Sequence, residues 1–438
     1  MSLLPPTLSN SLLTYQRPSG QHILKRVVDL GEWVNQRRES RVWPYTTTLH
    51  QHPSAQTEVS SENDVPRSGI NFASQDYLSL TGHPSVIAAA KTALDRFGPH
   101  SAGSASLQGN TSLSIQLETE LALALDTEHV VLYPTGWGAG YGVITGLVRP
   151  GDVVIMDQLA HACLQAGVAA ATTNVIRHKH LRTDEVPALL QKVRNDGHEG
   201  GIMVITEGLF SMDSDIPRIA ALQAACSAHD AVLVVDVAHD FGSLGPQGTG
   251  ALGLQDMIGK VDLVMGSFSK SFASNGGFVA THSAAVRDFL RIYSGPHTFS
   301  NALSPVQVAI VLECLRIVRS EEGEQRRQKM LSIARLLREE LTKEGVICIG
   351  EPSAIVPALV GKEPLARLAA RRLRSHSVFA NLVEFPAVGV NKARFRLQVM
   401  ADHEPHHAIA AAKAVSLSIA EAKQDLDEMN SKRGAAKI

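Results

Sequence analysis

Lys270 stands where a lysine can act as a nucleophile. It lies in "GSFSKSFASNGG", residues 266–277, directly after the apolar run "VDLVMG". An amine held in a dry pocket at the end of a strand loses its proton more readily and attacks carbonyl groups. A solvated loop lysine is the alternative, and this segment alone leaves both interpretations open. The residues that follow the other apolar runs must decide between them.

Asp236 and His239 follow a second apolar run, "AVLVV". A carboxylate at the end of so apolar a segment needs a cationic partner. His239 comes three residues later in "DVAHDFGSLGPQGTG", whose glycines let the backbone pass close to a ligand. This segment therefore offers a buried anion and an imidazole beside a possible ligand.

Three further apolar runs end in candidate residues. Thr135, Gly136 and Trp137 follow "VVLYP", where backbone N–H groups at a helix start suit a phosphate; an ordinary strand-to-helix turn is the alternative. His161 follows "DVVIMD", with a packed core histidine as the alternative. Glu207 follows "IMVIT" among acids that could bind a metal or cap a helix. Those acids have no His or Cys partner and the four cysteines lack C-x-x-C spacing, so we expect no metal.

The apolar runs alternate with amphipathic stretches such as "SLSIQLETELALAL" and "RIAALQAACSAHD". Continuous apolar strands separated by helices indicate an α/β fold with a mostly parallel central sheet and helices on both faces. Ligands of such sheets bind at the carboxyl ends of the strands. A buried aspartate, a histidine, an aromatic face, a phosphate cradle and a strand-end lysine together fit pyridoxal 5′-phosphate, which needs a Schiff-base lysine and an acid for its pyridinium nitrogen.

The regions before and after this central part have different sequence patterns. Residues 1–68 predict a helix in "HILKRVVDLGEWVNQRRES" followed by a loose linker, and residues 69–300 predict the large cofactor-binding domain. Residues 301–438 begin as a long helical stretch and continue with shorter strand candidates, "AIVPALVG" and "ARFRLQVM", before a last helix. We expect them to form a smaller C-terminal α+β domain.

Composition narrows the class of protein. The 438 residues are 44% hydrophobic and 19% charged, with 41 basic and 43 acidic residues. The absence of a basic excess argues against nucleic acid and anionic membrane surfaces as partners. No secretory signal is visible, and the uncharged stretch 130–148 contains Pro134 and several glycines, which predict strand, turn and helix start rather than a membrane span. We expect a cytoplasmic protein without stable membrane insertion.

From about residue 68 to 420 the chain resembles the α-oxoamine synthases. These enzymes have the pyridoxal-phosphate-dependent aminotransferase fold type I and condense an amino acid with an acyl thioester, with loss of CO2. They include 8-amino-7-oxononanoate synthase, 2-amino-3-ketobutyrate CoA ligase, 5-aminolevulinate synthase and serine palmitoyltransferase. The matching segments include "NFASQDYLSLTGHPSV", "GSASLQGNTSLSIQLETELA", "DQLAHACLQAG", "TEGLFSMDSD", "DVAHDFGSLGPQGTG", "GSFSKSFASNGG", "HTFSNALSP" and "ARFRLQVMADH".

The resemblance implies a role for each catalytic candidate. Lys270 would carry the Schiff base. Asp236 would pair with the pyridinium nitrogen, His239 would hydrogen-bond the phenolic oxygen, and His161 would stack on the ring.

The resemblance also implies which residues surround the phosphate. Thr135, Gly136 and Trp137 would sit beside it and Ser267 would touch it. Asn301, in "FSNALSP", stands where the family usually has a threonine that reaches the phosphate of the neighbouring subunit. This implies a homodimer with shared active sites.

Four residues would face the substrate. Arg396 would hold the amino-acid carboxylate, Glu207 and Ser211 would line the substrate side, and Gln75 stands where the family usually has asparagine. Further departures from the family pattern near the substrate weaken any transfer of substrate identity: Ser79, Ala105, Val237 and Asp240.

The expected reaction is a decarboxylative Claisen-type condensation of glycine, alanine or serine with an acyl thioester, on coenzyme A or an acyl carrier, giving an α-amino ketone. An aminotransferase or a carbon–sulfur lyase of the same fold is one alternative. A catalytically inactive partner subunit is another, although the presence of Lys270 argues against it.

Overall fold

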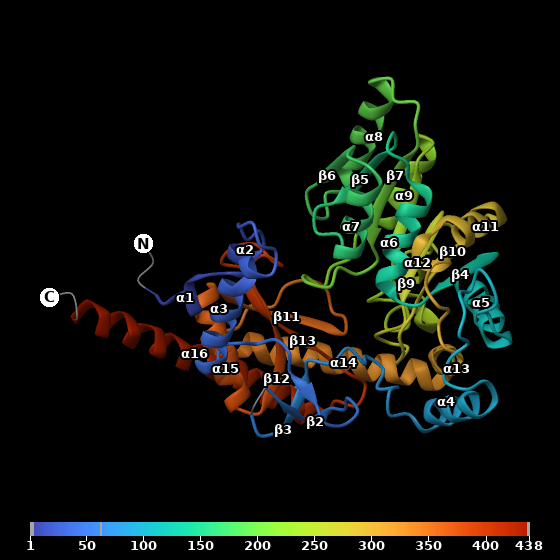
Figure 1. The fold of residues 1–438 in the computed structure, drawn as a ribbon. Helices are drawn as coiled ribbons and strands as arrows, with labels where there is room; N and C mark the ends of the chain where they lie inside the picture. Colours follow the sequence, from blue (N-terminus) through green and yellow to red (C-terminus); the bar gives the residue numbers. More distant parts are fainter. Residues whose placement is uncertain (1–3, 62–63, 436–438) are drawn as a thin grey trace. The chain divides into compact units, whose positions relative to one another are not determined.

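The computed structural model describes residues 4–61 and 64–435 (Figure 1). The chain forms two compact units. The large unit contains Gln75–Ser211 and Asp215–Gln328, and the small unit contains the described residues on either side together with Met212–Ser214. The predicted domains changed at residues 68/69 and 300/301. The compact units change instead at 74/75 and 328/329, because the first helix after residue 301 packs within the large unit.

A seven-stranded sheet forms the centre of the large unit. The strands β7, β8 and β9 run parallel to one another, as do β5, β6 and β7, whereas β10 is antiparallel to both of its neighbours. Each predicted apolar run is a strand, and β10 is a strand that the sequence analysis did not single out. The strand order is β4 (His129–Tyr133), β10 (Gly277–Thr281), β9 (Leu263–Ser267), β8 (Val232–Asp236), β7 (Ile202–Glu207), β5 (Val153–Asp157) and β6 (Val175–His178).

Helices cover both faces of this sheet, as predicted (Figure 1). Successive residues of β8 point into different cores: Leu233 and Val235 into one, Val234 into the other. The first core is closed by α4 (Pro84–Phe97), α5 (Ser112–Leu125), α8 (Val186–Asn195), α9 (Ile219–Ala228), α10 (Gly250–Leu254) and α13 (Pro305–Val318). The second is closed by α6 (Gly136–Leu147), α7 (Ala162–Ala171) and α11 (Ala284–Tyr293), and α12 (Gly295–Thr298) packs on α6.

The small unit is built on a six-stranded sheet to which both ends of the chain contribute. Its strands are β1 (Thr48–Leu49), β2 (Gln56–Ser60), β3 (Arg67–Phe72), β12 (Val378–Val383), β13 (Ala393–Gln398) and β11 (Ile355–Gly361), in that order. Among the described strands of this sheet, β3 and β12 pair in parallel and the other neighbours pair antiparallel. Its helices are α1 (Pro6–Ser9), α2 (Leu12–Tyr15), α3 (Val28–Glu39), α15 (Glu363–Ser375) and α16 (Pro405–Ala435), and α14 (Glu321–Lys343) continues into it from the large unit.

The loose linker expected after the first helix is therefore corrected to three paired strands. These strands are short and largely polar, so they lack the apolar periodicity that marks a strand in a sequence. β3 joins them to β12, which begins at Val378, far along the chain. Gly69 permits this pairing, because a Cβ atom there would collide with the backbone carbonyl of Ser377.

A buried ionic network ties the N-terminal segment to the C-terminal part of the small unit. Glu384 accepts from Arg367 Nε at 2.6 Å and lies 3.4 Å from Arg37 Nη1, with all three side chains buried. Arg367 also donates to the carbonyl oxygen of Leu8 at 2.6 Å. Burial lowers the pKa of Arg37 to about 10 although Glu384 opposes this effect. Glu384 thus compensates two buried guanidinium groups at once.

We expect Glu384→Gln to destabilise the small unit by about 3–5 kcal/mol, because the two buried guanidinium groups lose their counter-charge. Urea unfolding followed by circular dichroism measures the change. Glu339→Gln, at an exposed position on α14, is the matched control and should change stability by less than about 1 kcal/mol. Equal unfolding midpoints for the two variants would contradict this role of Glu384.

Among the described helices, none combines the length and the apolar character that crossing a membrane requires.

Candidate active site

A cavity of about 270 Å³ lies in the large unit at the carboxyl ends of the parallel strands. Nine of the residues predicted from the sequence line it: Thr135, Gly136, Trp137, His161, Glu207, Asp236, His239, Ser267 and Lys270. Segments far apart along the chain thus meet at one sheet edge, as expected for open α/β sheets. Their arrangement can be tested against the requirements of pyridoxal phosphate.

Asp236 ends β8 and is only 5% exposed. Its Oδ1 accepts a hydrogen bond from the Ala238 N–H at 2.9 Å. Burial raises the pKa of Asp236, while the charges of His161 and Lys270 act in the opposite direction. A buried carboxylate of this kind is stabilised by a cationic ligand, which is the property that a protonated pyridine ring supplies.

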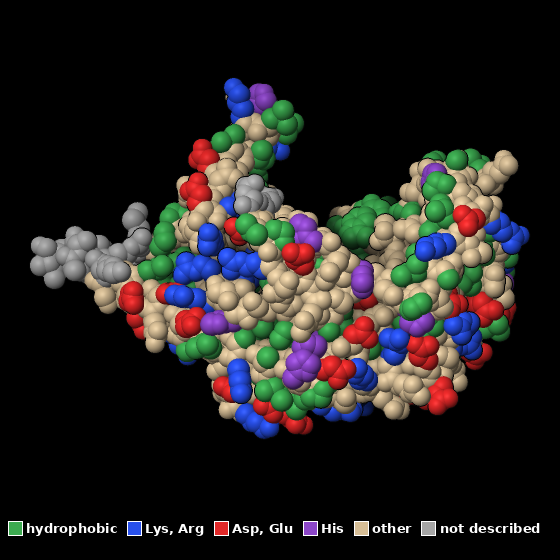
Figure 2. Space-filling model, turned by 90° about the horizontal axis from the view of Figure 1, so that it is seen from below, with side chains coloured by type: hydrophobic (Ala, Val, Ile, Leu, Met, Phe, Trp, Pro, Cys, Tyr) green, Lys and Arg blue, Asp and Glu red, His purple; other side chains and the backbone are tan. Residues whose placement is uncertain are grey.

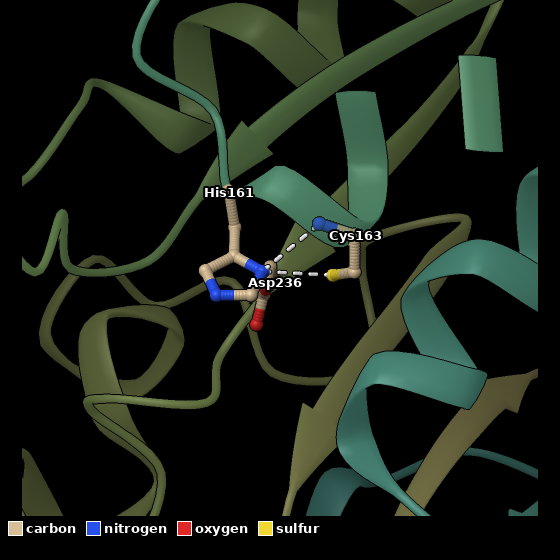
Figure 3. A group of neighbouring side chains, drawn as sticks. All are labelled: His161, Cys163 and Asp236. Atoms are coloured by element: carbon tan, nitrogen blue, oxygen red, sulfur yellow. Dashed lines mark hydrogen bonds between the residues drawn. The ribbon is translucent and has the colours of Figure 1, made fainter. Parts of the chain in front are cut away.

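His161 caps the N-terminus of α7 and projects from it toward Asp236 (Figure 3). Its Nδ1 lies 2.9 Å from Cys163 Sγ and accepts from the Cys163 N–H at 3.3 Å. The side chain is exposed, so the alternative of a packed core histidine is wrong. Donor atoms of His161, Cys163 and Asp236 lie within 4.8 Å of one another, a spacing that would also suit a metal ion. The expectation of no metal stays a prediction.

His239 is buried and its Nδ1 lies 2.9 Å from the hydroxyl of Tyr77. The contact fixes the orientation of an imidazole that lines the cavity. Tyr77 is a functional candidate that the sequence analysis missed. The available signal was its place in the segment "NFASQDYLSLTGHPSV", from which only Gln75 and Ser79 were considered.

Glu207 ends β7, directly opposite Asp236 in the sheet register. Burial and the charge of Asp236 raise the pKa of Glu207 well above its ordinary value, although the His161 N–H donates to its carboxyl group. Two carboxyl groups on adjacent buried strand ends disfavour simultaneous ionisation. Burial and the neighbouring Asp236 charge therefore both favour the protonated form of Glu207, which can donate a hydrogen bond into the cavity.

The start of α6 forms an anion cradle. Thr135 caps the helix, its Oγ1 accepting from the Gly138 N–H at 2.9 Å, and Gly136 begins it. A Cβ atom at Gly136 would collide with the side chain of Ser267, so glycine permits the close approach of the helix start to β9. The Ser267 and Ser269 hydroxyl oxygens lie 2.8 Å apart beside it. Helix N–H groups and hydroxyls at one point suit a phosphate group.

Trp137 is half exposed and stacks on Tyr141 of the same helix, with ring centroids 5.1 Å apart and planes 13° from parallel. One face of its indole is therefore occupied by the protein itself. Cys163, Ser269 and Asn275 also line the cavity and were not predicted as site residues. Cys163 lies in the quoted segment "DQLAHACLQAG", two positions after His161, so its place in the first turn of α7 was the signal that could have found it.

Four predicted site residues lie outside the lining of this cavity. Asn301 lines a separate cavity of about 620 Å³ in the large unit, together with Thr135 and Trp137. Gln75 begins the large unit, and Ser211 is buried just after β7. Arg396 lies on β13 of the small unit. The roles assigned to these four residues stay predictions.

Asp240, where the family usually has serine, is fully buried in the large unit. Its Oδ2 accepts from the Ala251 N–H at 2.7 Å, whereas Oδ1 is buried with no hydrogen-bond partner among the described residues. Burial raises the pKa of Asp240 from 3.8 to about 7. The folded protein therefore binds a proton at Asp240 that the unfolded chain has already released above about pH 4.

We expect the free energy of unfolding to decrease as the pH rises from the pKa of Asp240 in the unfolded chain through its pKa in the folded protein. Asp240→Asn removes this dependence. Relative to wild type, the variant should gain about 3 kcal/mol between about pH 5 and pH 8. Urea unfolding at several pH values measures the gain, with the exposed Asp196→Asn as control. A parallel pH profile for Asp240→Asn and wild type would show that Asp240 does not titrate in this range.

Known proteins are similar to this chain in sequence and in fold. The aminotransferase class I and II family profile matches residues 67–415. An 8-amino-7-oxononanoate synthase of Trichlorobacter lovleyi is 34% identical over 80% of this chain and 88% of its own length. A 2-amino-3-ketobutyrate coenzyme A ligase of Escherichia coli is 32% identical (79% and 86%), and a serine palmitoyltransferase of Sphingobacterium spiritivorum is 32% identical (76% and 82%).

Solved structures agree with these relatives. A high-resolution structure of SPT with a PLP internal aldimine has a TM-score of 0.85 and 26% identity, covering 92% of this chain and all of the other. Serine palmitoyltransferase of Sphingomonas wittichii also has a TM-score of 0.85, with 25% identity, over 92% of this chain and 99% of its own.

The chain therefore belongs to the aminotransferase class I and II family. Within that family it is an α-oxoamine synthase, a pyridoxal-phosphate-dependent acyltransferase. The fold, the cofactor and the enzyme class predicted from the sequence are confirmed.

Proposed function

We propose that this enzyme condenses glycine, alanine or serine with an acyl thioester, releasing CO2 and free thiol and forming an α-amino ketone. The supporting observation is the meeting of Lys270, Asp236 and His161 in one cavity beside the anion cradle at the start of α6. Relatives that carry three different names within this reaction class support the same chemistry. The acyl donor is acyl-coenzyme A or an acyl carrier protein.

The residues of the cavity fit the cofactor. Thr135, Gly136 and Ser267 would hold its phosphate, and Asp236 would hold the proton on its ring nitrogen. His161 would cover the ring. When bound, the group supplies an electron sink for a negative charge at the amino acid's α-carbon.

Lys270 and Glu207 are the residues proposed to act on protons in this reaction. Lys270 would supply the nucleophilic amine that holds the cofactor, and its Nζ would also serve as the base that removes the α-proton. Glu207, whose pKa is raised by burial and by the charge of Asp236, would in its protonated form donate a hydrogen bond toward the substrate side. Three further residues would face the substrate: Arg396, Gln75 and Ser211.

The decisive experiment is a screen of glycine, alanine and serine against acyl-coenzyme A donors of increasing chain length. Release of free thiol, matched mole for mole by CO2, is the expected result. An aminotransferase would produce a 2-oxo acid without thiol, and a carbon–sulfur lyase would act on a sulfur amino acid without any thioester. An inactive partner subunit would bind no cofactor and give none of these products.

We further propose that two copies of the chain share their active sites. Leu107 is 86% exposed and Phe299 is 89% exposed in the large unit, an arrangement that a second copy would cover. The segments that carry them are joined, since the Ala302 N–H donates to the Gly103 carbonyl at 2.9 Å. Asn301 lies on this surface, and its amide would reach the phosphate held by the partner chain.

Mixing of two inactive variants tests the shared site. Lys270→Ala removes the nucleophile, and Asn301→Asp places a negative charge against the phosphate. If the sites are shared, each heterodimer contains one site with both defects and one with neither. Random reassortment should then restore about a quarter of the wild-type activity. If Asn301 serves its own chain, mixing yields no gain over the two parents. A fully active monomer by light scattering would also contradict the proposal.

A further inference from the structure

A second cavity lies in the small unit and is lined by an unusual number of arginines. Its volume is about 140 Å³. The guanidinium-bearing residues that line it, here called the arginine pocket, come from α3, β3 and α15 and from the turn after α3: Arg38, Arg41, Arg67, Arg371 and Arg374. Figure 2 shows one group of neighbouring Lys and Arg side chains on the molecular surface, and others scattered over the rest of the visible face. None of these residues belongs to the cofactor cavity of the large unit.

The positive charge of the arginine pocket is only partly compensated. Among the described residues that line it, Asp64 is the one carboxylate. Arg371 has its own partner, since its Nη2 lies 3.0 Å from Asp425. Arg41 and Arg67 are exposed and make no ion pair with any described residue. Among the lining residues that the structure describes, guanidinium groups therefore outnumber carboxylates, and convergent like charges are relieved by a bound anion.

Arg374 gives the pocket a preorganised donor. Its side chain is partly buried, and it donates to the Ser61 hydroxyl and to the Pro44 carbonyl. Burial lowers the pKa of Arg374, with Asp64 acting in the opposite direction. These contacts hold the planar guanidinium in one orientation, which reduces the entropy lost when it binds an anion.

The remaining walls suit a small, oxygen-rich group. Ser60, Ser61 and Ser375 contribute hydroxyl groups, and Trp43 closes one side, with the Arg38 guanidinium 5.9 Å from its ring centroid. The volume is well below the roughly 300 Å³ at which pockets for whole drug-sized ligands begin. It is suited to a single tetrahedral anion, and guanidinium groups bind phosphate oxygens with strong, charge-assisted hydrogen bonds.

We propose that the arginine pocket is a binding site for one phosphate group, either inorganic phosphate or the terminal phosphate of a larger ligand. The site is independent of the proposed condensation, because it uses no residue of the cofactor cavity. Arg41, Arg67 and Arg374 are the residues that bind the phosphate oxygens.

Calorimetric titration of the holoenzyme with inorganic phosphate, at constant ionic strength in chloride, tests the proposal. Saturable binding is expected in the wild type. Arg41→Gln and Arg67→Gln should each weaken it about tenfold. Arg335→Gln, an exposed arginine of the small unit outside the pocket, is the matched control and should bind as the wild type does. The proposal is overturned if the wild type shows no saturable binding, or if all three variants weaken binding equally.

Adenosine 3′,5′-bisphosphate distinguishes the two sources of phosphate. Tighter binding than inorganic phosphate, weakened in Arg67→Gln, would identify a phosphate carried on a larger ligand. Equal or weaker binding, again weakened in Arg67→Gln, would identify inorganic phosphate. Binding that Arg67→Gln leaves unchanged would overturn the assignment of the site. No turnover is measured, so failure here is distinguishable from failure of the proposed reaction.

Discussion

Replacing Lys270 with alanine is expected to lower kcat by at least about a thousandfold and to abolish the visible absorbance band of the lysine-bound cofactor. Lys270 lines the cavity with Asp236, His161 and Ser267, so the variant loses the nucleophile and the base that removes the α-proton together. The cofactor phosphate would still be held at the start of α6. The variant should therefore retain cofactor that is easily removed by dialysis.

Two controls make the Lys270 result specific. Lys260→Ala removes an exposed lysine of the large unit that pairs with Asp256, and it should leave kcat and the spectrum unchanged. A small primary amine added to Lys270→Ala should restore part of the proton transfer, because the amine can occupy the space left by the side chain. Near-normal turnover of Lys270→Ala without added amine would refute the assignment of the active site.

The central sheet and the main site residues could be predicted because they depend on local signals. A strand buried on both faces is apolar throughout, so β4, β7, β8 and β9 stand out in the sequence. The residues that end or directly follow such strands lie at the common carboxyl edge. Asp236 and Glu207, which end β8 and β7, and Lys270, which follows β9, are found from that rule without any knowledge of long-range packing.

The parts that sequence analysis missed depend on contacts between distant segments. β2 is polar and becomes a strand by pairing with β3, which itself pairs with β12. Tyr77 acquires its importance only because the fold brings it to His239. The Glu384 network likewise joins residues more than three hundred positions apart. No local periodicity reports such contacts.

The electrostatic role of Asp236 can be tested separately from its packing by a substitution that keeps the shape of its side chain. In Asp236→Asn the amide oxygen can still accept from the Ala238 N–H, so the turn after β8 should be retained. The negative charge that holds a proton on the cofactor ring is lost. We expect the variant to bind the cofactor but to remove the α-proton of the amino acid about a hundredfold more slowly, or slower still.

Exchange of the α-proton for deuterium, followed by NMR with no thioester present, measures this step alone. The exposed Asp256→Asn serves as control and should exchange as the wild type does. A second readout concerns Glu207, which is proposed to act in its protonated form. Because the charge of Asp236 raises the pKa of Glu207, the Asn variant should lower that pKa and move the alkaline limb of the exchange profile to lower pH. Normal exchange with retained cofactor would show that Asp236 is only a buried core residue. A charge at Asp236 that acts on both the ring and Glu207 predicts slow exchange together with a shifted pH profile. A purely structural role of Asp236 would not produce both.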